Sequence, residues 1–449
     1  MSDELMKVAL VDIDGCAVQD GKLNQTMVDI LRKGGYDQVF LFTQRNTFLQ
    51  VAQITRAYAM ADTIPNIDQV ITTVDAVEQL SGAIGKPVAV STSVDQFFGQ
   101  PTAYYQETLA PFEKAVKEEA LRARTKSKSM DDFNAKQFNP QIEADTERMR
   151  KQLGINDPRV NMANLIPEGK VNQYRFLINN LPISSNDAIE VDYFDDSMRN
   201  LDEFLGEDLP VKPNLYLVSG QYAAPLATFD SKMAPHGRED ELAVVQTKAR
   251  YTDRGISREN ATLLAKYGSE LNKTIDAISH GLPEKEEEKA HRRMKDLAAV
   301  TAFLKGSELE KTDMARVRAF ALQEQDTKLL EIAYTKEYGL AKAALIAQCT
   351  LKYDSELNKT TSEPDMEAIQ VLKHTIDVLK SSENQPPPLD HQAFHKLSGL
   401  LPNADLSPIQ ENVTQSTKET CQHYKKRFHQ TLQSADAPAA PDSDIKPSN

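Results

Sequence analysis

The stretch KVALVDIDGCAV, residues 7–18, runs an apolar segment directly into two aspartates, Asp12 and Asp14. Side chains repeat with period 2 along a strand, so the two carboxyl groups share one face if the strand continues through them. A buried carboxylate is unfavourable unless it is compensated, and two like charges repel unless a cation or a proton lies between them. The pair therefore either ends the strand in solvent or holds a metal ion and carries chemistry.

The composition limits the classes of protein to which the chain can belong. Its 449 residues are enough for two or three domains, and its formal net charge of −14 makes duplex nucleic acid an unfavourable partner. We find no apolar run of membrane-spanning length and no classical secretory signal, so we expect no transmembrane segment and a cytoplasmic location. Three cysteines, Cys16, Cys349 and Cys421, lie far apart in the sequence and fit a reducing compartment.

Between residues 5 and 220, short apolar runs alternate with amphipathic segments. This alternation predicts an α/β domain, residues 1–235, with a largely parallel sheet covered by helices. One charged segment, residues 102–156, contains no strand-like run, and we expect it to be a helical insertion. The expected strands are KVALVDID (7–14), VFLFT (39–43), QVITTVD (69–75), PVAVSTS (87–93), IEVDYFD (189–195) and LYLVS (215–219).

From residue 240 onward the apolar pattern has a helical period. Leu264, Tyr267 and Leu271, for example, recur at steps of three and four residues, which predicts an all-helical domain over residues 240–434. Glycine and proline interrupt the pattern, as at Gly281 and Pro283. The last residues, 435–449, contain almost no bulky apolar side chain and are predicted to form a disordered tail.

Polar residues follow several of the expected strands of the α/β domain. The carboxyl ends of parallel strands meet at one edge of a sheet, where open α/β sheets gather their sites. We therefore expect these residues to lie close to the two aspartates of the first strand. They are Thr43, Gln44 and Arg45 after the second strand, Lys170 at the start of a helical segment, and Asp195 and Asp196 after IEVDYFD.

These motifs, in this order, resemble the phosphatase branch of the haloacid dehalogenase (HAD) superfamily. The first motif of that family is Asp-x-Asp, here DIDGC, and the second ends a strand in Ser or Thr, here FLFT. The third motif is a lysine, here Lys170, and the fourth is an acidic pair, here FDDSMRNL. The resemblance covers residues 5–220 and implies a HAD-like, Rossmannoid sheet domain.

The resemblance also implies a role for each motif residue. Asp12 is the nucleophile that forms an aspartyl-phosphate, and Asp14 protonates the leaving oxygen and then deprotonates the attacking water. Thr43 and Lys170 hold the phosphoryl oxygens, and the lysine stabilises the charge of the transferring group. The expected substrate-binding residues are Thr43, Gln44, Arg45 and Lys170.

Magnesium is the cofactor that the resemblance implies. It would offset the repulsion between the aspartates, and Asp196 would position Lys170 or a metal-bound water. The expected metal site comprises Asp12, Asp14 through its backbone carbonyl, Asp195 and Asp196.

Some residues depart from the family pattern or suggest other sites. Cys16 stands where Thr or Val is usual and is assigned no role, and Gln44 replaces the Gly that many members of one subgroup carry. His391 and His395 lie one helical turn apart, but a third zinc ligand is not evident. The basic run at 121–129 is interpreted as a solvated face, with attraction of an acidic substrate or phospholipid headgroup as the alternative.

The motifs together predict a Mg²⁺-dependent phosphomonoester hydrolase. The segment between the second and third motifs, residues 45–165, does not resemble the compact α/β lid of sugar-phosphate phosphatases. An open site flanked by helices and followed by a helical domain favours a large substrate, such as phosphotyrosine or phosphoserine on a protein, and phosphotyrosine is the one we expect. One alternative is a phosphatase of a small metabolite or a phosphoinositide. Another is a catalytically inert HAD scaffold that binds a host protein.

The helical region is expected to dock a partner protein or a membrane surface. A catalytic domain, a helical domain and a polar C-terminal tail in this order resemble secreted effectors of intracellular bacterial pathogens. That resemblance implies translocation into a host cell as the alternative to a purely cytoplasmic location.

Overall fold

The chain divides into two compact units, Met1–Ala265 and Lys266–Asn449. The first unit is built on a β-sheet, and the described part of the second unit is helical. The computed structural model describes residues 5–46, 71–125, 139–157, 169–181, 189–359, 363–381 and 388–412.

Among the described residues, the first unit contains a six-stranded sheet with the order β5-β4-β1-β6-β7-β8. The first five strands in this order pair in parallel, and the edge strand β8 is antiparallel to β7. The predicted α/β class with a mostly parallel sheet is confirmed. The strands are β1 (Met6–Val11), β4 (Gln38–Thr43), β5 (Ala89–Thr92), β6 (Ile189–Asp195), β7 (Asn214–Ser219) and β8 (Tyr222–Pro225), and a separate hairpin joins β2 (Val18–Gln19) to β3 (Lys22–Leu23).

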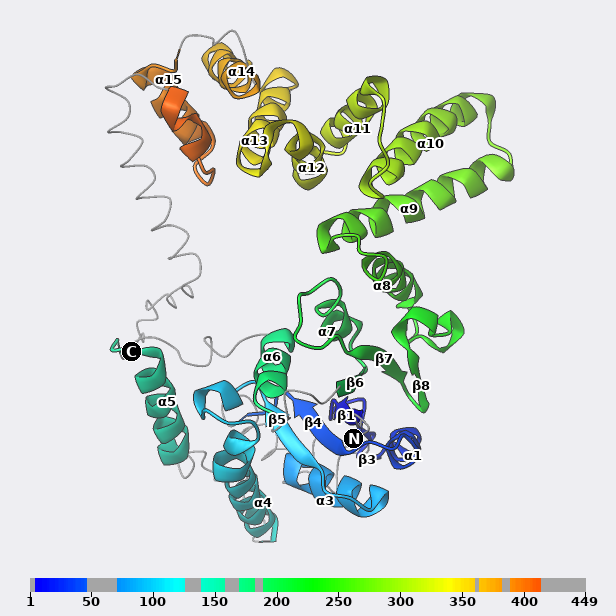
Figure 1. The fold of residues 1–449 in the computed structure, drawn as a ribbon, viewed down its shortest axis with the longest axis vertical. Coiled ribbons are helices and arrows are strands. Elements are labelled where there is room, and N and C mark those ends of the chain that lie inside the picture. Colours follow the sequence, from blue (N-terminus) through cyan, green and yellow to red (C-terminus); the bar gives the residue numbers. More distant parts are fainter. Residues whose placement is uncertain are drawn as a thin grey trace, which may run out of the picture. The chain divides into compact units, whose positions relative to one another are not determined.

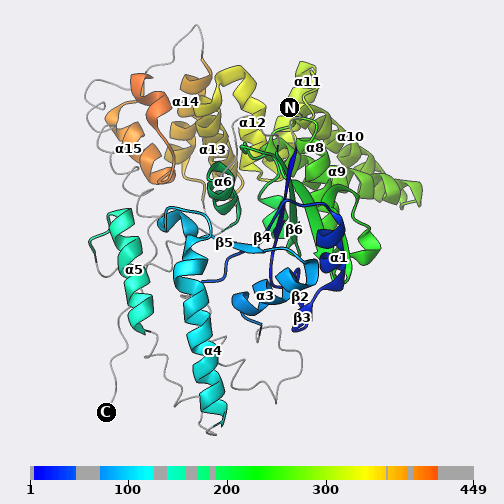
Figure 2. The same ribbon diagram turned by 60° about the horizontal axis from the view of Figure 1, so that its bottom comes forward.

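Helices cover both faces of the sheet, and α3 and α6 lie on opposite sides of it (Figures 1 and 2). On one face, α1 (Gln25–Lys33) and α3 (Thr73–Ile84) share a hydrophobic core with Ala9 and Val11 of β1. Ala9 and Val11 make this face of β1 apolar, and Val8 and Leu10 make the opposite face apolar too, as is usual for a buried parallel strand.

The second face carries a separate core. Here α6 (Val171–Asn179), α7 (Met198–Asp202) and α8 (Glu239–Thr252) share a hydrophobic core with Val8 and Leu10 of β1. Helix α8 lies beyond residue 235 in the sequence, but it covers the sheet. The division between the units falls within α9 (Arg258–Ser279), later than the predicted start of the helical domain at residue 240.

One predicted strand is wrong. The described part of QVITTVD is the start of helix α3, because Thr72 caps that helix. Its side chain accepts a hydrogen bond from the backbone of Asp75 at 3.0 Å, and Asp75 Oδ2 accepts one in return from the backbone of Thr72 at 3.1 Å. This capping box outweighs the strand preference of the β-branched residues.

The predicted insertion is helical where it is described. A π-helical turn, Tyr105–Leu109, leads into α4 (Ala110–Thr125), and α5 (Asn139–Leu153) follows. A small core that includes Phe98, Tyr104 and Met149 joins this segment to the residues after β5. The side chains of the basic run at 121–129 lie outside the described residues.

The second unit is described as a succession of helices. Gly281 and Pro283 interrupt the helical pattern where expected, and Pro283 caps α10. Within the described part of the chain, no helix has both the length and the apolar character needed to cross a membrane. The predicted tail, residues 435–449, and residues 413–434 lie outside the described residues. After α9, the helices are α10 (Glu284–Leu304), α11 (Lys311–Gln323), α12 (Thr327–Tyr338), α13 (Leu340–Leu357), α14 (Met366–Lys380) and α15 (His391–Leu400), followed by a 3₁₀ segment (Ser407–Asn412).

The packing of α8 on the sheet leads to a stability prediction. Leu242 is fully buried in the second core, whereas Val244 on the same helix is 38% exposed. Leu242→Ala should destabilise the sheet unit by about 2–5 kcal/mol, because it leaves a cavity, and Val244→Ala by less than about 1 kcal/mol. Hydrogen exchange of β1 and β6 amides measures both. Equal protection in the two variants would contradict the assignment of α8 to the sheet unit.

Candidate active site

The first aspartate of the motif lies directly beyond the central strand. Asp12 follows β1, and its backbone N–H donates to the carbonyl of Phe194 at 3.0 Å, which extends the pairing of β1 with β6. Gly15 then turns the chain with φ +76°, and a Cβ there would come within 2.3 Å of Asp196 Oδ2. A glycine is required both for this backbone conformation and for the close approach of Asp196.

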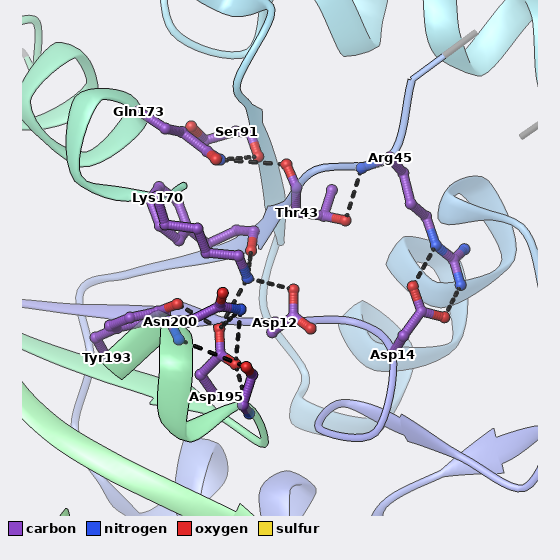
Figure 3. A network of polar contacts seen from close by, with 12 residues as sticks. Asp12, Asp14, Thr43, Arg45, Ser91, Lys170, Gln173, Tyr193, Asp195 and Asn200 are labelled. Atoms are coloured by element: carbon purple, nitrogen blue, oxygen red, sulfur yellow. Dashed lines mark hydrogen bonds and ion pairs between the residues drawn. The ribbon is translucent and has the colours of Figure 1, made fainter. Parts of the chain in front are cut away.

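Lys170 joins two of the motifs through its ammonium group. Nζ donates to Asp12 Oδ1 at 2.5 Å, to Asp195 Oδ2 at 2.9 Å and to the carbonyl of Phe42 at 3.0 Å (Figure 3). The side chain is only 2% exposed. Burial alone would lower the pKa of Lys170, but the two carboxylates outweigh it and raise that pKa, so the group stays charged.

The backbone of Lys170 is also held in place. Its N–H donates to Glu203 Oε2 at 3.0 Å, and a Cβ on the preceding Gly169, where φ is +89°, would come within 2.4 Å of the same oxygen. Glu203 therefore orients the start of α6, and the sequence interpretation missed it. Glu203 is the C-cap residue of α7 and carries no motif of its own.

Asp195 lies at the end of β6, is fully buried and accepts five hydrogen bonds. A carboxylate has about four lone-pair directions, so the protein already saturates this one. The donors are Lys170 Nζ, Tyr193 Oη, the backbone N–H of Ser197 at 2.8 Å, and Asn200 Nδ2, which lies 3.1 Å from each oxygen.

Three carboxylates gather beside this network and are called here the carboxylate cluster: Asp12, Asp195 and Asp196. One oxygen from each lies within 4.8 Å of the others. Burial first, and then the charge of Asp195, raise the pKa of Asp12 to about 7 and of Asp196 to about 6, although Lys170 opposes both shifts. Oxygen ligands at this spacing, with excess negative charge, fit a hard divalent cation.

The structure shows which acidic residue contacts the ammonium and where the carboxylate of Asp14 lies. Asp195, and not Asp196, contacts the Lys170 ammonium. The carboxylate of Asp14, for which the sequence predicts a metal contact only through the backbone carbonyl, lies outside the carboxylate cluster and pairs with Arg45. Asp12 and Asp196, which accept fewer hydrogen bonds from protein donors than Asp195, are thus the better-placed cation ligands of the cluster.

The second motif ends β4 beside the same edge of the sheet. Thr43 is buried, and its hydroxyl accepts the backbone N–H of Arg45 at 3.1 Å. Gln173 of α6 donates to the carbonyls of Thr43, at 3.3 Å, and Ser91, at 2.8 Å, and so ties together the ends of β4 and β5. Gln44 is half-buried beside Thr43, and its carbonyl accepts a hydrogen bond from Asn46.

The remaining candidates lie apart from this network or have no role in it. Burial above all raises the pKa of the Cys16 thiol, so Cys16 remains without an assigned role. In the part of the chain that the structure describes, the carboxylate cluster is the one group of three or more metal-ligating side chains, and His391 and His395 are not in such a group.

Comparison of the chain with protein-family models, with curated proteins and with solved structures gives no match. The interpretation of the site therefore depends on its own geometry. That geometry brings together residues from four separate parts of the sequence at the carboxyl edge of the sheet.

The buried lysine leads to a second stability prediction. Lys170→Met removes the cation that compensates Asp12 and Asp195, and should destabilise the sheet unit by about 3–5 kcal/mol. Lys212→Met, which removes a 67% exposed partner of Asp253, should cost less than about 1 kcal/mol. Hydrogen exchange of the β6 amides compares the two variants. A Lys170 variant as stable as the Lys212 variant would show that the buried pair is not required.

Proposed function

We propose that this protein is a Mg²⁺-dependent phosphomonoester hydrolase that acts through an aspartyl-phosphate on Asp12. The observation that carries the proposal is the buried Lys170 ammonium, which bridges Asp12 and Asp195 beside the carboxylate cluster. A carboxylate nucleophile, a fixed cation and a site for a divalent ion together suit transfer of a charged phosphoryl group.

The position of these groups in the fold supports the proposal. From β1 the chain proceeds to β4 and β5 on one side, and then crosses to β6 and β7 on the other. The strand order reverses at β1, and in open α/β sheets ligands bind at the carboxyl ends of the strands at such a switch point. Asp12 lies directly after that strand, and Thr43 and Asp195 end its two neighbours.

Each residue of the site has a separate role in the proposed reaction. A carboxylate oxygen of Asp12 attacks phosphorus while the bond to the ester oxygen breaks, and Asp14 supplies the proton that the leaving oxygen takes. Water then attacks the phosphorus of the aspartyl-phosphate, the bond from phosphorus to the Asp12 oxygen breaks, and Asp14 takes a proton of the water as phosphate leaves. Lys170 stabilises the charge on the phosphoryl oxygens, and the Thr43 hydroxyl is assigned to bind them.

Magnesium fits the residues present. Asp12 and Asp196, with Asp195 behind them, would hold it, and when bound it would neutralise phosphoryl and carboxylate charge. A small metabolite and a phosphoinositide are the alternatives to a phosphorylated protein as substrate. A phosphotyrosine substrate stays the prediction of the sequence, and a panel of phosphopeptides and phosphometabolites tests it.

Hydrolysis of p-nitrophenyl phosphate tests the proposal. We expect turnover with Mg²⁺, none with EDTA, and a loss of at least about 10³-fold in Asp12→Asn, because the amide is not a nucleophile. Asp29→Asn is the matched control, since Asp29 lies on the surface of α1 and pairs only loosely with Lys33. Absence of turnover in the wild type with this ester and with the panel would favour the inert scaffold.

Magnesium binding gives an independent test. Titration calorimetry should show Mg²⁺ binding that Asp196→Asn weakens and Asp29→Asn leaves unchanged. The raised pKa values of Asp12, about 7, and Asp196, about 6, mean that protons compete with the cation. Affinity should therefore fall as the pH is lowered from 8 to 6. Binding that is indifferent to Asp196→Asn would contradict the assigned ligands.

A further inference from the structure

Arg45 binds Asp14 at two points. Its Nε donates to Asp14 Oδ2 at 2.9 Å, and its Nη2 donates to Oδ1 (Figure 3). The arginine side chain is only 4% exposed, whereas that of Asp14 is 52% exposed. A bidentate pair with a buried guanidinium sets both the position and the plane of the carboxylate.

Arg45 is itself anchored from its other side. Nη1 donates to the carbonyl of Ile71, just before α3, at 2.8 Å. The buried Glu113 of the inserted helix α4 attracts the guanidinium. Glu113 is fixed in turn, because its oxygens accept hydrogen bonds from the Thr73 hydroxyl at 2.8 Å and the Val74 N–H at 3.0 Å. The guanidinium is thus held by groups that contact neither Asp12 nor Lys170 in the described network.

The pair with Arg45 separates the two aspartates of the first motif. In Figure 3, Asp12 points toward Lys170 and Asp14 points toward Arg45. The two residues are only one position apart in the chain, and Asp14 is nevertheless not in the carboxylate cluster. Without Arg45, rotation about the side-chain bonds of Asp14 would let its carboxylate turn toward that cluster, where a cation would attract it.

We propose that Arg45 is a positioning residue that holds the Asp14 carboxyl group on the leaving-group side of the phosphoryl site, rather than a residue that binds the substrate phosphate. This inference rests on the proposed phosphatase function and replaces the substrate-binding role that the sequence suggested for Arg45. In the first step the bond from Asp12 to phosphorus forms, the ester P–O bond breaks, and the leaving oxygen takes the Asp14 proton. Arg45 acts on that transfer through its pair with Asp14 and is not assigned a contact with the phosphoryl group.

The leaving group distinguishes the two roles. p-Nitrophenolate is a weak base that departs without a proton, whereas the alkoxide of ethyl phosphate requires one. General acid catalysis contributes on the order of 10²–10⁴-fold, so we expect Arg45→Met to lower kcat/KM for ethyl phosphate about 10²-fold or more, and for p-nitrophenyl phosphate less than about tenfold. The ratio kcat/KM reports the steps up to the first irreversible one, so hydrolysis of the intermediate does not mask the difference.

Asp14→Asn provides the matched comparison. It should show the same difference between the two esters, and adding Arg45→Met to Asp14→Asn should leave the ratio of the two kcat/KM values within about threefold. Arg45→Lys keeps the charge but loses the two-point pair, so it should show a smaller difference between the esters. If the Met variant does not fold, as judged by circular dichroism, the Lys variant carries the test.

Equal losses for the two esters would assign Arg45 to phosphate binding and overturn the proposal. So would a further change of the ratio when Arg45 is replaced in the Asp14→Asn background. If the wild type hydrolyses neither ester nor any member of the substrate panel, the phosphatase function itself fails. Hydrolysis of both esters without the expected difference overturns only the role of Arg45.

Discussion

The compensation of buried negative charge by one ammonium group is the constraint on which the site depends. Lys170 lies between Asp12 and Asp195, almost entirely out of water. Two carboxylates this close would otherwise repel each other in a medium of low polarity. The lysine reaches them because α6 starts at the carboxyl edge of the sheet, and Glu203 holds that start in place.

The same constraint explains which partners the surrounding carboxylates have. Asp195 is saturated with hydrogen bonds, which fixes its position and that of the ammonium group. Burial leaves the negative charge of Asp12 and Asp196 poorly solvated, which raises both pKa values and favours a cation beside these carboxylates. Asp14 belongs to a second network, in which Arg45 connects it to the segment before α3. The two aspartates of the first motif thus have different partners, Lys170 for Asp12 and Arg45 for Asp14.

Much of the fold was predictable because apolar strands and helix caps are local signals. Five of the six expected strands appear in the sheet. The sixth segment begins a helix instead, because the capping box of Thr72 and Asp75, which is also a local signal, favours a helix start. Helix α8 was assigned to the wrong unit for a different reason. Its amphipathic pattern predicts a helix, but Leu242 belongs to the same buried core as residues of β1 and β6 that are distant in sequence, and no local pattern specifies that core.

The sequence by itself determined the residue types of the site. It also showed that most of them follow a strand, because strand periodicity and turn residues reveal where each strand stops. Only the tertiary structure decided which groups pair. It placed Asp195 rather than Asp196 on Lys170, directed Asp14 to Arg45, and brought in Glu203 and Gln173. The physical reason is that hydrogen bonds and ion pairs depend on distances of about 3 Å between side chains. Sequence motifs order the residues along the chain, but they do not contain those distances.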